Sequence, residues 1–426
     1  MSLPKGFFIG ASTAAHQVEG NNVHSDYWLM EHMEHSSFVE PSGEAVDHYH
    51  RYEEDIKLMA QAGLNAYRFS IEWARIEPEK DRFDDSEIEH YRKVIRCCKE
   101  NGLTPIVTLM HFTSPAWLIR EGGWESEATV ERFKIYCEYV VDRLGDELEY
   151  VATLNEANMG LQLAALMERF AKQAAAQAAE SQDGTVQVGL NMEAMQQQQA
   201  AIAQENLSVF GTAAPATFVS PLSAEGDRIV MRAHEAARDA IKAKCPHLKV
   251  GLTLSLHDVQ VTEEGGEPFA AKEWDEEFLH YLPVLKKDDF FGVQNYTRSQ
   301  YGKDGIIPVP AGAELTQMNY EYYPQALEHV IRKVRQELDI PLLVTENGVA
   351  TADDTRRVAF IQQALEGVQH CVDDGIPVIG YCHWSLLDNF EWQMGYRMTF
   401  GLIAVDRTTQ ERHPKESLRV LGSWAQ

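Results

Sequence analysis

Short runs of apolar, β-branched and aromatic residues alternate with longer segments in which apolar residues recur at helical spacing. Segments such as 47–63 and 355–375 have that spacing and end at glycine, a common residue after the last turn of a helix. Eight runs predict strands, at residues 7–12, 65–70, 104–109, 150–155, 250–255, 290–296, 342–347 and 377–384. Strands that alternate with helices favour a parallel sheet, and eight such units favour an α/β fold of the closed (β/α)₈ TIM-barrel type.

Residues 159–206 break this rhythm, because the segment is long and rich in alanine, glutamine and methionine. Leu163, Leu166, Met167 and Phe170 recur at helical spacing, "SQDG" (181–184) interrupts, and a second helical stretch follows. The segment is predicted to be an enlarged, mostly helical fourth βα excursion. Because such excursions lie on the catalytic face of a barrel, a lid that shapes substrate access is a compatible second interpretation. No linker separates domains, so residues 1–426 are predicted to form a single catalytic barrel.

The chain is strongly acidic, with a formal net charge of −27 over 426 residues. Such a surface repels phosphate backbones and anionic lipids, so neither nucleic-acid nor membrane binding is expected. No apolar run is long enough to cross a membrane, and the N-terminus lacks the pattern of a signal peptide. The six cysteines show no paired spacing, which predicts reduced thiols and a cytoplasmic location.

Several common catalytic motifs are missing from the sequence. It contains no GxGxxG, no GxxxxGK[ST] and no GxSxG, which disfavours nucleotide binding and serine-hydrolase chemistry. His32 and His35 in "EHMEH" have a spacing that can chelate a metal on a helix, but the segment lacks the HExxH arrangement. No cofactor and no metal are therefore predicted.

Two predicted strands end on a glutamate beside an asparagine: Glu156 in "TLNEAN" (153–158) and Glu346 in "VTENGV" (344–349). Since all strands of a parallel barrel end at the same rim, these carboxyl groups can face each other across its mouth. Glycoside cleavage needs such a pair, one group to protonate the leaving oxygen and one to attack the sugar or activate water. The alternative is that they form salt bridges, which are common for glutamates at a barrel rim.

Aromatic and polar residues near other strand ends strengthen the carbohydrate interpretation. Trp384, Phe390 and Trp392 surround Glu391 after the last strand, and indoles stack on the C–H faces of sugars while carboxylates bind their hydroxyls. His111 ends the third strand, Gln17 follows the first, and Asn155 precedes Glu156, so each is a candidate sugar ligand. The alternatives are that the tryptophans belong to the core and that His111 is a structural histidine.

The chain resembles the family 1 glycoside hydrolases, the β-glucosidase family, along almost its whole length. The matching segments are "FFIGASTAAHQVEG" (7–20), "YRFSIEWARIEP" (67–78), "IVTLMHF" (106–112), "TLNEAN", "GVQNYTR" (292–298), "VTENGV" and "HWSLLDNFEWQMGYRMTFGLIAVDRTTQERHPKESL" (383–418).

The resemblance implies a barrel that acts with retention of configuration through two glutamates. Glu346 would be the nucleophile and Glu156 the acid/base, with Arg68 and Tyr296 beside Glu346. Arg68 would keep Glu346 ionised, whereas the charge of Glu346 and partial desolvation would keep Glu156 protonated until the substrate is cleaved. The sugar would be bound by Gln17, His111, Asn155, Glu391 and Trp392, with Trp384 stacking under the ring.

The chain departs from the usual family pattern at several positions. Ala157 stands where proline usually follows the acid/base, and Gln294-Asn295-Tyr296 stands where Asn-Tyr-Tyr is usual, so that Gln294 replaces an asparagine amide. Residues 159–206 match nothing in the pattern, which leaves the aglycone open. Glu391 stands where 6-phospho-glycosidases of the family tend to carry a smaller residue, so an unphosphorylated sugar is predicted.

The leading prediction is a β-glucosidase that hydrolyses small β-glucosides, with the β-glycoside as its partner molecule. A β-galactosidase, β-fucosidase or transglycosylase with the same residues is a second prediction, since Glu391 and Gln17 suit both gluco and galacto epimers. A sugar-binding barrel without turnover is a third, motivated by Ala157 and the unusual excursion. The oligomeric state stays open, including an assembly of identical copies.

Overall fold

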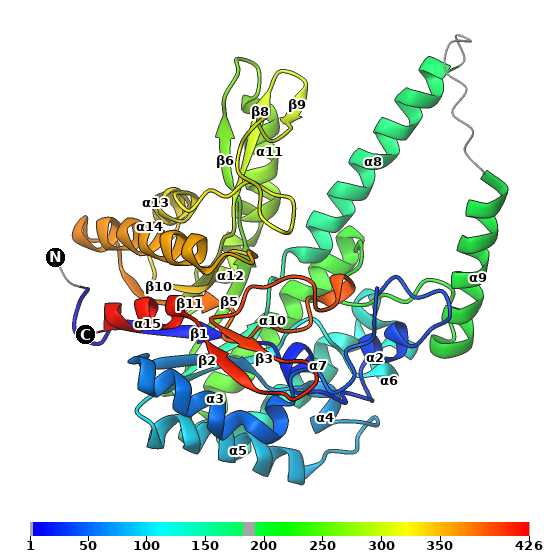
Figure 1. The fold of residues 1–426 in the computed structure, drawn as a ribbon. Coiled ribbons are helices and arrows are strands. Elements are labelled where there is room, and N and C mark those ends of the chain that lie inside the picture. The colour runs from blue at the N-terminus through cyan, green and yellow to red at the C-terminus, as the bar shows by residue number, and fades with distance from the viewer. Residues whose placement is uncertain (1–2, 182–191, 426) are drawn as a thin grey trace.

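The computed structural model describes residues 3–181 and 192–425, and Figure 1 shows helices packed around a central barrel of strands. Eight parallel strands close the barrel in the order β1-β11-β10-β7-β5-β4-β3-β2. They are β1 (Phe8–Ser12), β2 (Ala66–Ser70), β3 (Thr104–Met110), β4 (Tyr150–Leu154), β5 (Lys249–Ser255), β7 (Phe290–Gln294), β10 (Leu342–Asn347) and β11 (Val378–Trp384). Each predicted strand overlaps one of these eight, so the predicted (β/α)₈ fold is confirmed.

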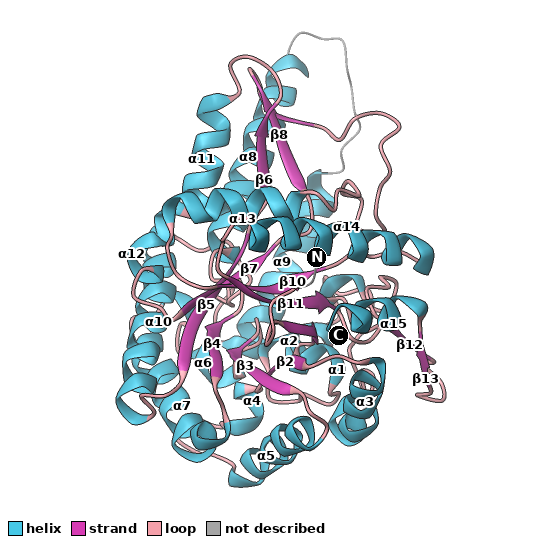
Figure 2. Ribbon diagram, turned by 90° about the vertical axis from the view of Figure 1, so that its left-hand side faces the viewer, coloured by secondary structure: helices cyan, strands magenta, loops and turns pink. Residues whose placement is uncertain are grey.

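Helices connect the strands and cover the outside of the barrel, as Figure 2 shows from a second direction. The longer ones are α3 (His48–Ala62), α5 (Asp85–Glu100), α7 (Ala128–Leu144), α8 (Met159–Ser181), α9 (Met192–Phe210), α10 (Ala224–Lys244), α11 (Glu267–Glu277), α13 (Ala326–Glu337) and α14 (Asp354–Asp373). The shorter ones are α1 (Ala15–Val18), α2 (Asp26–Glu31), α4 (Trp73–Ile76), α6 (Ala116–Arg120), α12 (Leu282–Leu285) and α15 (Glu416–Gly422).

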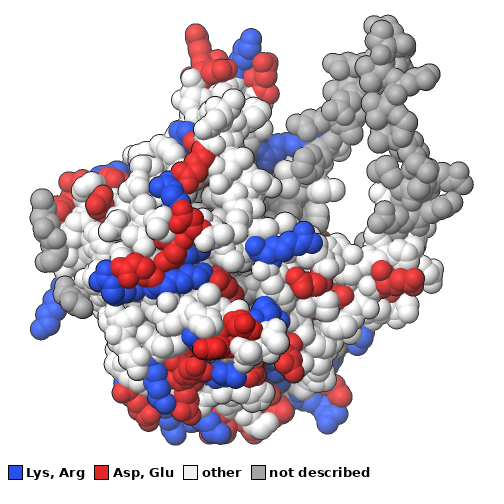
Figure 3. Space-filling model, in the orientation of Figure 1, with Lys and Arg blue, Asp and Glu red and all other residues white. Residues whose placement is uncertain are grey.

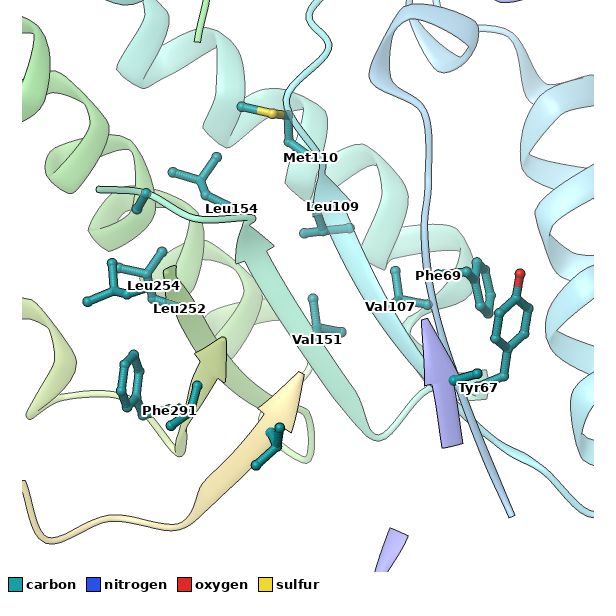
Figure 4. Close-up of a cluster of buried hydrophobic side chains, with 14 of the residues drawn as sticks. Tyr67, Phe69, Val107, Leu109, Met110, Val151, Leu154, Leu252, Leu254 and Phe291 are labelled. Carbon is teal, nitrogen blue, oxygen red and sulfur yellow. The ribbon is translucent and has the colours of Figure 1, made fainter. Parts of the chain in front are cut away.

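The barrel strands send alternate side chains to opposite sides, as the period of a strand requires. Tyr67 and Phe69 of β2 belong to the large cluster between strands and helices, together with Val107 of β3. Figure 4 shows these side chains beside those of the neighbouring strands. Both faces of the sheet are buried, which explains why the strands read as nearly continuous apolar runs.

A smaller apolar cluster fills the inside of the barrel. It consists of Ala66, Ile106, Ala152, Phe290, Leu343 and Cys382, all fully buried. Two or four residues further along the same strands, the alternating positions hold Arg68, Thr108 and Gln294. The interior therefore changes from an apolar floor to a polar rim at the C-terminal ends of the strands, where barrel enzymes carry their active sites.

The fourth excursion leaves the rim as α8 and returns as α9, and both helices stand out from the barrel in Figure 1. Leu166 is 36% exposed and Met167 is 54% exposed, so the apolar spacing that predicted this helix does not bury these two side chains against the barrel. The Phe170 side chain and the interruption after Ser181 lie outside the described residues. Arg120 of α6 donates a hydrogen bond to the Val209 carbonyl of α9 at 3.0 Å.

Two small sheets stand beside the barrel, and the sequence analysis did not predict them. β6 (Asp258–Val261), β8 (Arg298–Gly302) and β9 (Gly305–Ile307) form a three-stranded sheet, and β12 (Ile403–Val405) pairs with β13 (Arg412–Pro414). The predicted strand 290–296 ends earlier than expected, at Gln294. The amide of Asn295 donates to the carbonyls of Leu256 and Thr297 and so draws the chain away from the barrel ladder.

The surface in Figure 3 carries acidic and basic side chains interspersed over the visible face. All six cysteines are buried and free of disulfide bonds, which agrees with the reduced thiols predicted from their spacing. Within the described residues, no helix has both the length and the apolar character needed to cross a bilayer.

Candidate active site

Glu346 lies at the C-terminal end of β10, on the rim where all eight strands end. The pairing of β10 with β7 shifts here, because Val344 is opposite Val293 whereas Glu346 is opposite Gln294. The extra residue on β10 forms a β-bulge, a feature that re-aims the side chains next to it. The bulge brings the Glu346 carboxylate against side chains from β2 and from the loop after β7.

Both carboxylate oxygens of Glu346 accept hydrogen bonds. Arg68 Nη1 lies 2.6 Å from Oε1, and the Tyr296 hydroxyl lies 2.6 Å from Oε2. The Arg68 side chain is fully buried, so water screens its charge little. Burial raises the pKa of Glu346 above its usual value, while the charge of Arg68 and the hydrogen bonds from Tyr296 and Arg68 lower it. These contacts favour the ionised carboxylate.

Glu156 lies two residues beyond Leu154, the last residue of β4, and is also buried. Its Oε1 accepts a hydrogen bond from the Gln294 amide at 2.9 Å. Burial and then the negative charge of Glu346 raise the pKa of Glu156 well above its usual range, and the charge of Arg68 offsets them only in part. The two carboxyl groups are therefore close in space and differ in their environments, so that Glu156 holds its proton more strongly.

A second group of polar residues lies where β1 and the segment after β11 meet. Gln17 Nε2 donates to the Phe390 carbonyl at 2.7 Å and to Glu391 Oε2 at 3.3 Å. Burial and then the charge of Glu346 raise the pKa of Glu391 to about 8, while the bond from Gln17 lowers it. Below that pH Glu391 keeps a proton, so it can both donate and accept hydrogen bonds at the site.

His111 and Asn155 connect this group to the two glutamates. His111 Nε2 lies 3.9 Å from Glu346 Oε1, and burial together with the charge of Arg68 lowers the pKa of His111 well below its usual value. The imidazole is therefore neutral and can serve as a hydrogen-bond donor or acceptor. Asn155 Oδ1 accepts a bond from Arg68 Nη2 at 2.6 Å, which fixes the asparagine amide beside the ion pair.

Two tryptophans border the same group. The Trp384 ring lies 5.6 Å from the His111 ring, at an angle of 24°. Trp384 also belongs to a buried apolar cluster against which Tyr296 packs. Trp392 has a positive φ of 46° and lies nearly parallel to His16, with 6.0 Å between the ring centroids. Trp384 is 3% exposed, so it is also part of an apolar cluster, as the alternative interpretation of this residue expected.

Three polar atoms in this group are buried and have no hydrogen-bond partner within residues 3–181 and 192–425: Gln17 Oε1, His111 Nδ1 and Asn155 Nδ2. Buried polar atoms normally have hydrogen-bond partners, and each exception needs an explanation. One acceptor, one ring nitrogen and one donor, gathered around two carboxylates, are suited to a ligand with several hydroxyl groups.

The comparisons with known proteins agree with this geometry. The family model described as Glycosyl hydrolase family 1 matches residues 1–426. The chain belongs to glycosyl hydrolase family 1. It is 47% identical to the solved β-glycosidase BGL167, with a TM-score of 0.87, over 99% of this chain and 97% of that one.

Relatives of known activity are similar to this family 1 chain over nearly their whole lengths. A bifunctional β-D-glucosidase/β-D-fucosidase of Bifidobacterium breve is 30% identical, over 98% of this chain and 96% of the relative. A β-glucosidase of an Agrobacterium species is 28% identical, over 99% of this chain and 94% of the relative. The similarity thus covers nearly the whole of this chain and nearly the whole of each of these glycosidases.

The structure brings together all the residues that the family resemblance implied. Glu156, Glu346, Arg68, Gln294 and Tyr296 form one network, and Gln17, His111, Asn155, Trp384, Glu391 and Trp392 border it. Their individual roles in binding and catalysis stay predictions.

Three residues of the site escaped the sequence analysis. The Thr253 hydroxyl of β5 accepts a hydrogen bond from the Glu156 N–H, and the side chain of Ser255, also on β5, forms a hydrogen bond with the Glu156 carboxyl group. Tyr320 lies in the loop before α13, close enough to Glu391 and Glu156 for their charges to raise the pKa of its phenol beyond the effect of burial. No motif points to these residues; only the alternation of side chains along β5 gives a signal for Thr253 and Ser255.

The histidine pair considered for a metal does not converge in the structure. His32 Nδ1 pairs with the Trp28 carbonyl at 2.7 Å, whereas His35 Nδ1 pairs with Glu205 Oε1 of α9 at 2.7 Å. Within the described residues, His35 instead gathers with Glu34 and Glu205 on an exposed surface. That cluster connects α9 to the segment after α2. Its residues make none of the contacts to Glu156 or Glu346 described above.

Proposed function

We propose that this family 1 enzyme is a retaining β-glucosidase that hydrolyses small unphosphorylated β-glucosides by double displacement. The observation that carries the proposal is the contrast between two buried carboxyl groups at one rim. Glu346 has a cation and a phenol on its two oxygens, while the pKa of Glu156 is raised well above its usual range. A nucleophile must be ionised and a general acid protonated, and these environments favour that division.

In the first step Glu346 attacks the anomeric carbon of the bound glucoside. A carbon–oxygen bond forms between the sugar and the carboxylate while the bond to the aglycone breaks. The proton of Glu156 goes to the departing oxygen, which leaves as an alcohol. Arg68 and Tyr296 orient the carboxylate for this attack.

In the second step water replaces the aglycone. The negative charge of Glu346 is gone once its ester has formed, so the pKa of Glu156 falls and Glu156 acts as a base. Glu156 takes a proton from water, the water oxygen attacks the anomeric carbon, and the Glu346 carboxylate leaves. Gln294 donates a hydrogen bond to Glu156 while it is ionised at the start of this step.

The unphosphorylated sugar is supported by the charges around Glu391. Its pKa responds to the negative charge of Glu346 and to the Gln17 amide, and no lysine or arginine is among the described groups that shift it. A 6-phosphate would bring two negative charges into a buried site that already holds the ionised Glu346, and no cation among the described groups that shift Glu391 would neutralise them. Free hydroxyl groups would instead satisfy the buried polar atoms of Gln17, His111 and Asn155.

A β-fucosidase or β-galactosidase activity is the second candidate. The Bifidobacterium breve relative is named for activity on both glucosides and fucosides. Gln17 and Glu391 offer both donors and acceptors, which suit either orientation of a sugar hydroxyl. The same residues would perform the chemistry on each sugar and would also support transglycosylation to an acceptor alcohol.

A panel of p-nitrophenyl glycosides tests these proposals. β-Gluco, β-galacto, β-fuco and 6-phospho-β-gluco substrates are assayed from pH 5 to pH 8, with Glu346→Gln as the blank. Release from the β-glucoside that is absent in the blank and poor for the 6-phosphate is expected. No release from any of the four by folded protein would refute the hydrolase proposal.

A sugar-binding barrel without turnover is distinguished by a variant with a missing nucleophile. Glu346→Gly should lose hydrolysis and partly regain turnover when azide is added as a substitute nucleophile. The product would be the α-glycosyl azide, since only one displacement occurs. A location in the cytoplasm, with free thiols, completes the proposal, and its test is fractionation of the source cells.

A further inference from the structure

The backbone at Glu156 adopts a conformation that residues other than glycine rarely take. Its φ of 46° lies in the left-handed region, which carries an energetic cost and persists only where surrounding contacts hold it. In the family pattern, proline usually follows this glutamate and fixes the next φ angle, but here Ala157 follows. The turn that aims the Glu156 carboxyl group is therefore held by other contacts in this chain.

Thr253 of β5 supplies two of those contacts. The Thr253 hydroxyl accepts a hydrogen bond from the Glu156 N–H at 2.9 Å, and the Thr253 carbonyl accepts one from the Ala157 N–H at 3.0 Å. Proline at position 157 could not donate the second bond, because it has no N–H. The last ladder pair of β4 and β5 joins Ala152 to Gly251, so these bonds tie the strands together beyond that point.

The side chain of Thr253 is itself fixed by its neighbour on β7. A Cβ atom at Gly292 would lie 2.5 Å from Thr253 Cγ2, so glycine leaves the space that the threonine methyl group occupies. A β-branched side chain has few χ1 states, and with its methyl group held there the hydroxyl points to the Glu156 N–H. Thr253 is fully buried, so water cannot replace its hydroxyl as an acceptor.

We infer that Thr253 is a positioning residue for Glu156, and that it replaces the restraint that proline gives in the usual family pattern. The inference rests on the proposed function, since it requires Glu156 to protonate the leaving group. Loss of the hydroxyl leaves a buried N–H without an acceptor and frees the turn to move. A misplaced proton donor slows the cleavage of aglycones that need protonation and spares those that leave as stable anions.

The test compares two substrates in Thr253→Val, which keeps the side-chain shape and removes the hydroxyl. The measured quantity is kcat/KM, which reports the first displacement, for phenyl and 2,4-dinitrophenyl β-glucoside. Thr253→Val is expected to lose about tenfold or more on the phenyl glucoside and less than about threefold on the dinitrophenyl glucoside. The high-pH limb of its profile is expected to shift, because the environment of Glu156 changes.

Thr108→Val is the matched control, since Thr108 is buried on β3 and its hydroxyl has no hydrogen-bond partner in the part of the chain that the structure describes. Thr108→Val should keep the wild-type kcat/KM on both substrates, and therefore the wild-type ratio between them. Thr253→Ser, which keeps the hydroxyl, should restore the phenyl glucoside activity to within about threefold of wild type. If Thr253→Val does not fold, Thr253→Ser and Thr253→Ala repeat the comparison, because they differ by only the hydroxyl.

Equal losses on both substrates with an unchanged pH profile would overturn the inference, since a merely structural residue gives that result. Wild-type levels for Thr253→Val on the phenyl glucoside would overturn it as well. If the wild type cleaves neither substrate, the proposed function fails and the inference fails with it. Selective loss in Thr253→Val, beside a fully active wild type and Thr108→Val, supports both.

Discussion

The two glutamates of the site are held in different ways. Glu346 is fixed through its carboxylate, by a buried arginine on one oxygen and a phenol on the other. Glu156 is fixed through its backbone, by Thr253, and uncharged groups bond its carboxyl group, namely the amide of Gln294 at 2.9 Å and the side chain of Ser255. The pKa of Glu156 is raised well above its usual range, whereas cationic and phenolic contacts counteract the rise at Glu346.

This difference fits the catalytic role proposed for each glutamate. A nucleophile needs one orientation and one charge state when substrate arrives, so contacts to its carboxylate are suitable. An acid/base must change its charge in each cycle, and a strong ion pair would hold it in the ionised state. Support through the backbone fixes the position of Glu156 without fixing its protonation.

Replacing the two glutamates in turn gives the largest expected effect. Glu346→Gln should lose about 10⁴-fold or more in kcat/KM on every substrate, because no covalent intermediate can form. Glu156→Gln should lose about 10²–10⁴-fold on phenyl β-glucoside and far less on the dinitrophenyl glucoside. Kinetics on both substrates check this, and similar profiles for the two variants would erase the proposed distinction.

Arg68 sets the charge state of Glu346 in this comparison. Arg68→Met should lower kcat/KM by about 10²–10³-fold, since it removes a buried charge from the reacting group. Without the cation the pKa of Glu346 rises further, so activity should begin to fall at a higher pH on the acid side. Arg68→Lys keeps a charge and should shift that limb less. If the acid limb of the pH profile is identical in Arg68→Met and the wild type, Arg68 does not control the ionisation of Glu346.

The Tyr296 hydroxyl makes the second contact to the same carboxylate. Tyr296→Phe should lower kcat/KM by about 10–10²-fold, the range expected for a hydrogen bond to a charged group. Its acid limb should move to higher pH, in the same direction as for Arg68→Met but by less. pH profiles of both variants on the dinitrophenyl glucoside measure this. A shift in the high-pH limb instead would assign Tyr296 to Glu156.

Gln294 is the contact that the chain places on the acid/base, and the smallest effect is expected there. Gln294→Asn shortens the side chain and should lose the bond to Glu156, with a fall of about two- to tenfold on phenyl β-glucoside. Because this bond favours ionised Glu156, its loss should raise the pKa of Glu156 and move the high-pH limb upward. A downward movement of that limb would contradict the contact.

The fold was predictable because strand periodicity survives in a barrel whose sheet is buried on both faces. Runs such as 104–109 and 342–347 need no partner to be recognised. The sheet of β6, β8 and β9 was missed because its strands have only three to five residues, too few for a hydrophobic period to be recognised. The apolar spacing at Leu166 and Met167 predicted a helix correctly but gave no sign that these side chains stay exposed.

The site was predictable at positions where a residue with a characteristic chemical role, such as a glutamate, stands at the end of a predicted strand. Glu156, Glu346 and the residues of the matching motifs fall in this group. Thr253 could not be found in this way, since threonine is an ordinary strand residue and its contact to Glu156 joins positions 97 residues apart. The raised pKa of Glu391 could not be predicted either, because it depends on burial and on the charge of Glu346. Only the folded chain brings Glu391 and Glu346 close together.

The packing beneath the two carboxyl groups requires a glycine at position 292 of β7, because a Cβ atom there would collide with its neighbours. A Cβ atom at Gly292 would lie 2.5 Å from the methyl group of Thr253 and 3.1 Å from that of Thr345, the residue before Glu346. One added methyl group would thus push on the strand that holds the acid/base and on the strand that carries the nucleophile at the same time. The distance between the proton donor and the attacking oxygen therefore depends on the absence of a side chain at position 292, where even the methyl group of alanine would not fit.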